Sequence, residues 1–169
     1  MTEICRNNLE GIVAKLASST YQPDKRTGAW VKFKCGFAQD FVIGGYKRGQ
    51  GNRSAFGALI VGYYESGRLR YASKVGTGFS TLQIREFLRL SQPLVQARPP
   101  FEHVPLGQGT SWTYGLTAAE LRSSVWLKPV LTCGVRFTEW TMGGHLRDPC
   151  FEGLRDQEAG EVGREDLAG

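Results

Sequence analysis

The sequence predicts a mainly β protein, and three observations carry that prediction. Glycine is abundant, at 22 of 169 residues, and Val, Ile, Phe, Tyr and Trp fill the runs between the glycines. Such runs favour short strands, and glycine favours the turns that join them. Residues 29–36 (AWVKFKCG) also alternate with the two-residue period of a strand.

The length and composition indicate a globular protein with one core and room for a small appendage. Apolar residues make up 41% and charged residues 22% of the chain, a balance that disordered proteins lack. No apolar run approaches the roughly 18 residues that span a bilayer, and residues 1–10 lack a signal-peptide pattern. We therefore expect a cytoplasmic protein without a membrane segment.

Charge is distributed unevenly along the chain. Residues 37–155 carry fourteen Lys/Arg against eight Asp/Glu, whereas residues 156–169 carry one against five. A basic body suits a polyanion such as nucleic acid, because neutralising phosphates releases counterions. The acidic tail has no apolar pattern, so we expect it to be disordered.

The four cysteines are widely spaced, with no CxxC pair and only two histidines in the chain. A zinc site normally needs clustered thiolates or imidazoles. Reduced, mostly buried thiols are therefore favoured over a metal site or a disulfide framework.

Two strands are expected at the start of the chain, at 9–16 and 29–36, joined by a turn-rich loop at 17–28. Two strands alone are only marginally stable. Residues 1–36 therefore indicate the edge of a larger sheet.

From residue 37 onward the pattern predicts strands at 41–49, 58–64 and 68–78, then a helix over about 81–91 that is capped by Ser80 or Thr81. Loop follows at 93–121. Strand material returns at 125–140, with interruptions at Pro129 and Gly134, and a last extended piece covers 145–155. This order matches a five-stranded Greek-key OB-fold barrel with a helix between strands 3 and 4. We expect it to occupy residues 37–155.

The first two strands place Glu10 and the lysines 15, 32 and 34 beside Trp30. Lysines neutralise nucleotide phosphates and a carboxylate can hold Mg²⁺, so this set suits a nucleotide site. An ordinary solvated strand face with alternating lysines explains the same pattern.

A second basic set follows in the barrel region. The loop 47–54 holds Lys47, Arg48 and Arg53 among glycines, and the strand after residue 67 adds Arg68, Arg70 and Lys74. We expect these six side chains to contact the backbone phosphates of duplex DNA. Single-strand binding would need exposed aromatic platforms, and Phe56, Tyr63 and Tyr71 are better explained as core residues.

The segments EGIVAK (10–15) and WVKFKC (30–35) resemble the fourth and fifth nucleotidyltransferase motifs of ATP-dependent DNA ligases and mRNA capping enzymes. FVIGGYKRGQGNRSAFGALIVGYY, LRYASKVGTGF and VRFTEWTMGGHLRDPCFEGLR resemble the OB domain of bacterial DNA ligases. The nearest subfamily is the ligase module of the multifunctional nonhomologous end-joining enzymes of DNA repair and recombination. The resemblance runs in order from about residue 9 to residue 155.

This resemblance implies roles for single residues. Glu10 would be the metal-associated carboxylate, and Lys32 and Lys34 would face the adenylate phosphate. Lys15 closes the fourth motif and Trp30 opens the fifth. Arg155 matches the start of a final Arg-x-Asp-Lys motif that orients the pyrophosphate of ATP. The resemblance thus implies ATP and Mg²⁺ in the complete enzyme.

The sequence departs from the ligase pattern at two points. It holds no K-x-D-G tetrapeptide, whose lysine takes up AMP, and it has Gln157-Glu158 where the last motif ends in Asp-Lys. We therefore expect a chain that binds DNA but does not adenylylate itself, and that binds no cofactor alone. The nucleophile would come from a nucleotidyltransferase domain in cis or in trans. A stand-alone OB-fold module for protein interaction or assembly is the alternative.

Overall fold

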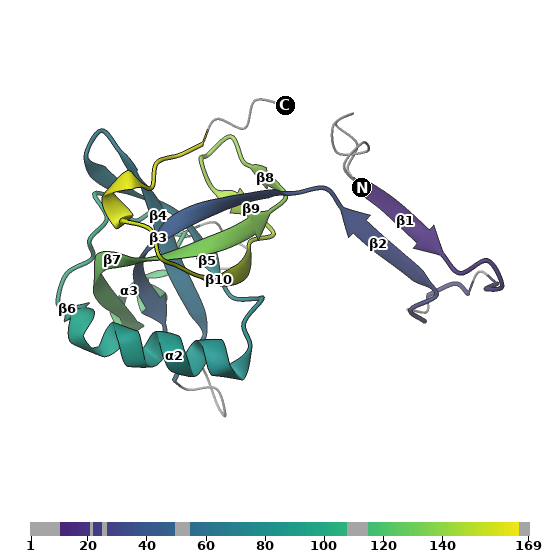
Figure 1. The fold of residues 1–169 in the computed structure, drawn as a ribbon, viewed down its shortest axis with the longest axis horizontal. Helices are drawn as coiled ribbons and strands as arrows, with labels where there is room; N and C mark the ends of the chain where they lie inside the picture. The colour runs from purple at the N-terminus through teal and green to yellow at the C-terminus, as the bar shows by residue number, and fades with distance from the viewer. Residues whose placement is uncertain (1–10, 21, 25–26, 50–54, 108–114, 166–169) are drawn as a thin grey trace.

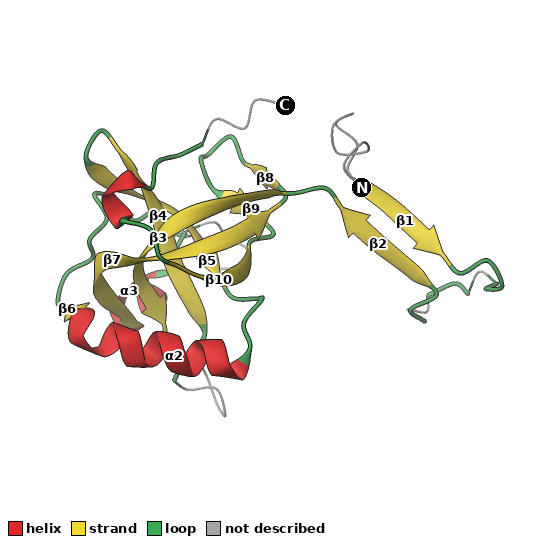
Figure 2. Ribbon diagram, in the orientation of Figure 1, coloured by secondary structure: helices red, strands yellow, loops and turns green. Residues whose placement is uncertain are grey.

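The computed structural model describes residues 11–20, 22–24, 27–49, 55–107 and 115–165, and it is mainly β (Figures 1 and 2). The strands are β1 (Gly11–Lys15), β2 (Trp30–Lys34), β3 (Phe37–Lys47), β4 (Ala58–Glu65), β5 (Arg68–Val75), β6 (Val95–Gln96), β7 (Ser124–Phe137), β8 (Glu139–Trp140), β9 (Leu146–Arg147) and β10 (Cys150–Arg155). The helices are α2 (Thr81–Ser91) and α3 (Ala118–Ser123), with the 3-10 turns η2 (Gln92–Leu94) and η3 (Ala159–Glu161).

The main sheet has the strand order β10-β7-β3-β4-β5, with every neighbouring pair antiparallel. The helix α2 comes between β5 and β7 in the chain and lies across one end of the strands (Figure 1). This order is that of an OB-fold, so the predicted fold is confirmed. The ladder does not close between β5 and β10. A backbone hydrogen bond from Phe151 N to Thr77 O, 2.9 Å long, joins the two edges instead.

The predicted helix at 81–91 is confirmed at both ends. Ser80 is its N-cap and accepts a hydrogen bond from Gln83 N, while the Gln83 side chain accepts one from Ser80 N. This reciprocal pair satisfies two backbone donors that a helix start otherwise leaves free. The helix buries Phe87 in the interior of the barrel.

Two apolar clusters cover the two faces of the sheet. The inner cluster lies inside the barrel, and it includes Phe41, Ile43, Leu59, Val61, Phe87 and Phe137. The outer cluster lies on the other face of the sheet, where residues from the segment after β6 and from η3 onward pack against the strands. It includes Val42, Ile60, Tyr71, Phe101, Leu116, Trp126 and Val162. Phe56, Tyr63 and Tyr71 are each only 6% exposed, which confirms that they fill the core.

Two strand predictions need correction and a third is confirmed. β3 begins at Phe37, earlier than the predicted start at residue 41. β7 is continuous through Gly134, because Gly134 is paired with Asp40 on one side and with Gly153 on the other. Near Pro129 the ladder does shift, since Leu131 pairs with Ile43 while Trp126 pairs with Gly45.

The expected disorder of the tail does not hold for residues 156–165. Val162 is only 3% exposed and packs in the outer cluster, and its carbonyl accepts a hydrogen bond of 2.7 Å from Tyr64 N. The Gln39 side chain donates to the carbonyl of Gly163. A single apolar residue among acidic neighbours thus anchors a segment that composition alone would leave free.

The first two strands pair as predicted. β1 and β2 form an antiparallel hairpin that projects away from the barrel (Figure 1). Cys35, which follows the hairpin, is disulfide-bonded, so the expectation of reduced thiols is wrong at this position. Cys133 and Cys150 are free, and Cys133 is buried. Within the described ranges no helix is long and apolar enough to cross a membrane.

Candidate nucleotide and nucleic-acid interface

One face of the hairpin carries the residues that the sequence predicts to contact a nucleotide. Lys15 pairs with Trp30 in the register, and its Nζ atom lies 4.1 Å from the centroid of the Trp30 ring. Val13 pairs with Lys32, so the alternation of the strands places Lys32 on the same face. Such a cation–π contact contributes about 0.5–1 kcal/mol at an exposed site. The face therefore holds two lysines and an aromatic ring, with Lys15 directly over the ring.

Two further predicted residues belong to the same region. Lys34 pairs with Gly11 in the register, and only its backbone is described. Glu10, the predicted metal ligand, lies outside the described residues. Within the described part of the chain, no group of three or more His, Cys, Asp or Glu side chains could hold a metal ion.

The opposite face of the hairpin is apolar and unusually exposed. Val31 and Phe33 lie on it with exposed fractions of 46% and 45%. Leu16, just past β1, is 61% exposed. A strand face of this kind is normally covered by another layer of structure.

In the barrel, Lys47 and Lys74 meet at one carboxylate. Lys47 Nζ lies 2.7 Å from Glu120 Oε1, and Lys74 Nζ lies 3.0 Å from Glu120 Oε2. Glu120 also accepts a hydrogen bond from the backbone N–H of Thr117, which caps α3. Burial opposes ionisation of Glu120, but the hydrogen bonds from Lys47, Thr117 and Lys74 outweigh it and lower the pKa to about 2. Both lysines thus tie α3 to the sheet.

Arg68 and Arg70 meet at a second carboxylate. Both guanidinium groups form ion pairs with Glu102, and Arg70 also pairs with Glu65 at 3.1 Å. Hydrogen bonding from Arg68 lowers the pKa of Glu102. The backbone N–H of Glu102 donates to the carbonyl of Leu69, which fixes the carboxylate beside β5.

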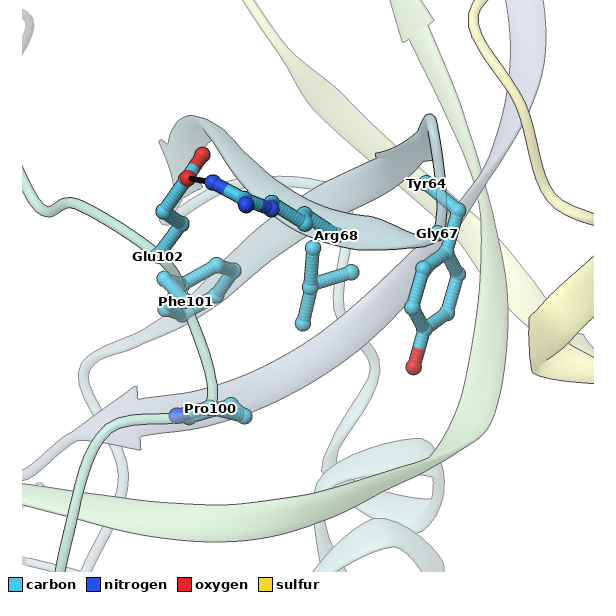
Figure 3. A pocket seen from close by; sticks show the side chains of 7 residues that line it. Tyr64, Gly67, Arg68, Pro100, Phe101 and Glu102 are labelled. Atoms are coloured by element: carbon cyan, nitrogen blue, oxygen red, sulfur yellow. Dashed lines mark hydrogen bonds and ion pairs between the residues drawn. The ribbon is translucent and has the colours of Figure 1, made fainter.

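This ion-pair group borders an open pocket of about 390 Å³ (Figure 3). Its lining comes from the β4–β5 turn and the segment around residue 101: Tyr64, Gly67, Arg68, Leu69, Pro100, Phe101 and Glu102. Figure 3 shows the Arg68 side chain reaching across the pocket toward Glu102. The pocket therefore presents a neutralised pair rather than a free cation.

The predicted DNA contacts on β5 do not all lie on one face of the sheet. The β4–β5 register shifts between Val61 and Gly62, and Lys74 pairs with Ile60 of the outer cluster. Arg70 instead pairs with Tyr63 of the inner cluster. Arg48 is exposed, and Arg53 lies outside the described residues.

Several exposed cations were missed by sequence reasoning. Besides the predicted contacts, the exposed cations that form no ion pair in the described residues include Arg85, Arg89, Arg98, Arg122 and Lys128. Arg85 and Arg89 are four residues apart on α2, so they lie on one helix face. Counting charges on the polar face of the predicted helix would have found this pair.

Arg155, the predicted pyrophosphate contact, is the last residue of β10. Its Nε donates to Asp40 Oδ1 at 3.2 Å, and Nη2 lies 3.7 Å from Glu152 Oε2. Glu139 pairs with Arg147 at 2.7 Å.

The fold and these surfaces define an OB-fold protein with an appended strand hairpin that carries a cationic, aromatic face. Residues 52–158 match the family of the ATP-dependent DNA ligase C-terminal region. The chain belongs to this family.

Relatives and solved structures agree with this assignment. The chain is 36% identical over its whole length to the multifunctional non-homologous end joining protein LigD of Pseudomonas aeruginosa, and it covers 19% of that protein. The LigD protein of Mycobacterium tuberculosis is 37% identical over 95% of this chain, which covers 20% of it. The crystal structure of the M. tuberculosis LigD ligase domain matches 97% of this chain at 36% identity, with a TM-score of 0.67. A mycobacterial DNA ligase D complexed with ATP and MES matches 97% at 34% identity, with a TM-score of 0.62.

This chain therefore spans about a fifth of the length of these curated relatives and half of the solved ligase domains.

Proposed function

We propose that this chain grips duplex DNA at a nick or an end while an ATP-dependent ligase joins the strands in nonhomologous end joining. Membership of the ligase C-terminal family supports this role, as do the two LigD relatives. A role of this kind places the chain on chromosomal DNA in the cytoplasm. The observation that carries the proposal is the hairpin face on which Lys15, Trp30 and Lys32 lie together beside an OB-fold.

The hairpin supplies phosphate contacts to ATP within a complete nucleotidyltransferase domain. Exposed ammonium groups next to an aromatic ring fit a nucleotide phosphate by charge and by hydrogen-bond donors. Lys15, Lys32 and Lys34 would neutralise and orient the phosphates, and Glu10 would hold Mg²⁺, which offsets the remaining negative charge. Residues 1–36 are then the last strands of that domain, and the rest comes in cis or in trans.

This chain does not adenylylate itself. A covalent adenylate needs a lysine nucleophile, and the K-x-D-G tetrapeptide that presents it is absent from the sequence. Intact mass after incubation with ATP and Mg²⁺ tests this directly. We expect an unchanged mass, and a gain of one AMP would show that another lysine acts as the nucleophile.

The barrel grips DNA through phosphates and not through bases. The basic residues available are Lys47, Arg48, Arg53, Arg68, Arg70 and Lys74, four of which share two carboxylates. We expect weak affinity for a nicked duplex that falls steeply between about 50 and about 200 mM salt, since each phosphate contact contributes about −0.9 to the log–log slope. Fluorescence anisotropy measures it. Affinity that stays flat over this range contradicts the proposal.

A second candidate function is protein interaction or assembly without ligase activity. The apolar hairpin face at Leu16, Val31 and Phe33 favours it, because such a face could recruit a partner strand or layer. Sedimentation velocity at several concentrations separates the two. Self-association that Phe33→Thr abolishes favours assembly, whereas a monomer that binds DNA favours the ligase role.

A further inference from the structure

The side chain of Arg155 lies across three strands, over a row formed by Gly153, Gly134 and Asp40, which we call the seat. Gly153 on β10 pairs with Gly134 on β7, and Gly134 pairs with Asp40 on β3. Two facing glycines followed by an aspartate leave a row without side chains that ends at a carboxylate. Glycine inside a strand weakens it and often marks a place where another group approaches closely.

Arg155 fills the space that the two glycines leave. A Cβ atom at Gly134 would lie 2.1 Å from Nη2 of Arg155 and 2.5 Å from its Cζ, distances that no real contact shows. At Gly153, where φ is +150°, a Cβ would lie 3.3 Å from Nη1. The guanidinium group therefore lies directly over the backbone of Gly134, and a side chain at position 134 would displace it.

Polar groups hold the seated arginine at both ends. Asp40 accepts from Nε at 3.2 Å, and Glu152 lies 3.7 Å from Nη2. Thr132 Oγ1 donates to the carbonyl of Arg155 at 3.1 Å, which fixes the backbone as well. The side chain is still 37% exposed, so a ligand in solvent can reach it.

We infer that Gly134, Gly153 and Asp40 are positioning residues that hold Arg155 in a resting orientation, and that a phosphate anion competes with Asp40 for its guanidinium. A surface ion pair alone needs no glycine row, whereas a planar guanidinium lying on the strand backbone does. A carboxylate and a phosphate both fit the fork of an arginine, so one excludes the other from the same N–H groups. The competition between phosphate and Asp40 rests on the proposed function. The position of the Arg155 side chain over Gly134 does not.

The seat is tested by the exchange of the Arg155 Nε–H with water in protein labelled with ¹⁵N-arginine, with Arg155→Lys used to assign the signal. We expect Asp40→Ala and Gly134→Ala each to speed exchange several-fold. Asp156→Ala removes the same charge next to Arg155, and Gly143→Ala fills an exposed glycine with ordinary space around it. Both controls should leave exchange unchanged. If Gly134→Ala fails to fold, Asp40→Ala still decides. Exchange that is equal in Asp40→Ala and Asp156→Ala overturns the seat.

Competition is tested by titrating the same signal with inorganic pyrophosphate. We expect the midpoint for Asp40→Ala to fall several-fold below that for Asp156→Ala, because only the first releases the guanidinium. Equal midpoints overturn the competition, since net charge alone then explains them. A signal that responds in no variant shows that Arg155 is not the pyrophosphate contact that the ligase resemblance implies, while the exchange rates still report on the position of its side chain.

Discussion

The Nζ atom of Lys74 lies 3.0 Å from Oε2 of Glu120, and the two side chains are only 16% and 14% exposed. The other oxygen of the Glu120 carboxylate forms an ion pair with Lys47, and the carboxylate also accepts a hydrogen bond from the backbone N–H of Thr117 at the start of α3. One side chain thus joins two strands and a helix. A charge with this many partners stabilises the fold if it stays ionised, and a lost partner leaves a mostly buried charge without compensation.

Glu120→Gln is therefore expected to lower the free energy of unfolding by about 1–3 kcal/mol near neutral pH. Glutamine keeps the shape and can still cap Thr117, so the change reports the charge of the carboxylate. Glu86→Gln on the exposed face of α2 is the matched control, with an expected change within about 0.5 kcal/mol. Urea unfolding measures both. Equal losses in the two variants would show that the ion pairs contribute nothing specific.

Stability should also depend on pH through Glu120. Its pKa in the folded protein is about 2, below the ordinary value of 4.5. The folded state thus binds the proton less tightly than the unfolded state. The stabilisation is present above about pH 4.5 and is lost as the pH falls toward about 2. Urea unfolding at several pH values should show a weaker acid dependence in Glu120→Gln than in the wild type. Parallel curves would assign the acid loss to other groups.

The sequence predicted the parts of this structure that depend on neighbouring residues. The helix at 81–91 was predicted because its cap at Ser80 and its apolar spacing are local signals. The partners of Lys47 and Lys74 were not, because Glu120 lies 73 and 46 residues away along the chain. The shift in register between Val61 and Gly62 also has no local signal, and it separates Lys74 from the arginines of the same strand.

The candidate site shows the same division. Strand alternation alone placed Trp30 and Lys32 on one face, and the register then brought Lys15 onto it. The seat of Arg155 depends on glycines from two strands that meet only in the folded sheet. Charge counts identified a basic body correctly but could not show which cations are already neutralised by carboxylates.

The helix α2 offers a direct test of the core. Phe87 is 2% exposed and packs inside the barrel, whereas Leu82 on the same helix is 75% exposed. Phe87→Ala should reduce the free energy of unfolding by about 3–5 kcal/mol through lost burial and a cavity. Leu82→Ala should change it by no more than about 0.5 kcal/mol. Thermal and urea unfolding of the pair measure the difference. Similar losses would mean that α2 does not plug the barrel.

Glu102 provides the test of how the barrel meets DNA. It forms ion pairs with both Arg68 and Arg70, and Arg70 also pairs with Glu65, so these carboxylates compete with DNA phosphates for the two arginines. Glu102→Gln should free Arg68 and leave Arg70 paired with Glu65 alone. We expect it to raise affinity for a nicked duplex and to steepen the salt dependence by up to about two phosphate contacts. Glu86→Gln adds the same net charge on α2, away from β5, and should have a smaller effect. Anisotropy titrations over a range of salt concentrations distinguish the variants. If both glutamine variants bind alike, net charge governs binding and β5 is not a contact. If Glu102→Gln binds more weakly than the wild type, the carboxylate holds the arginines in the orientation that DNA requires.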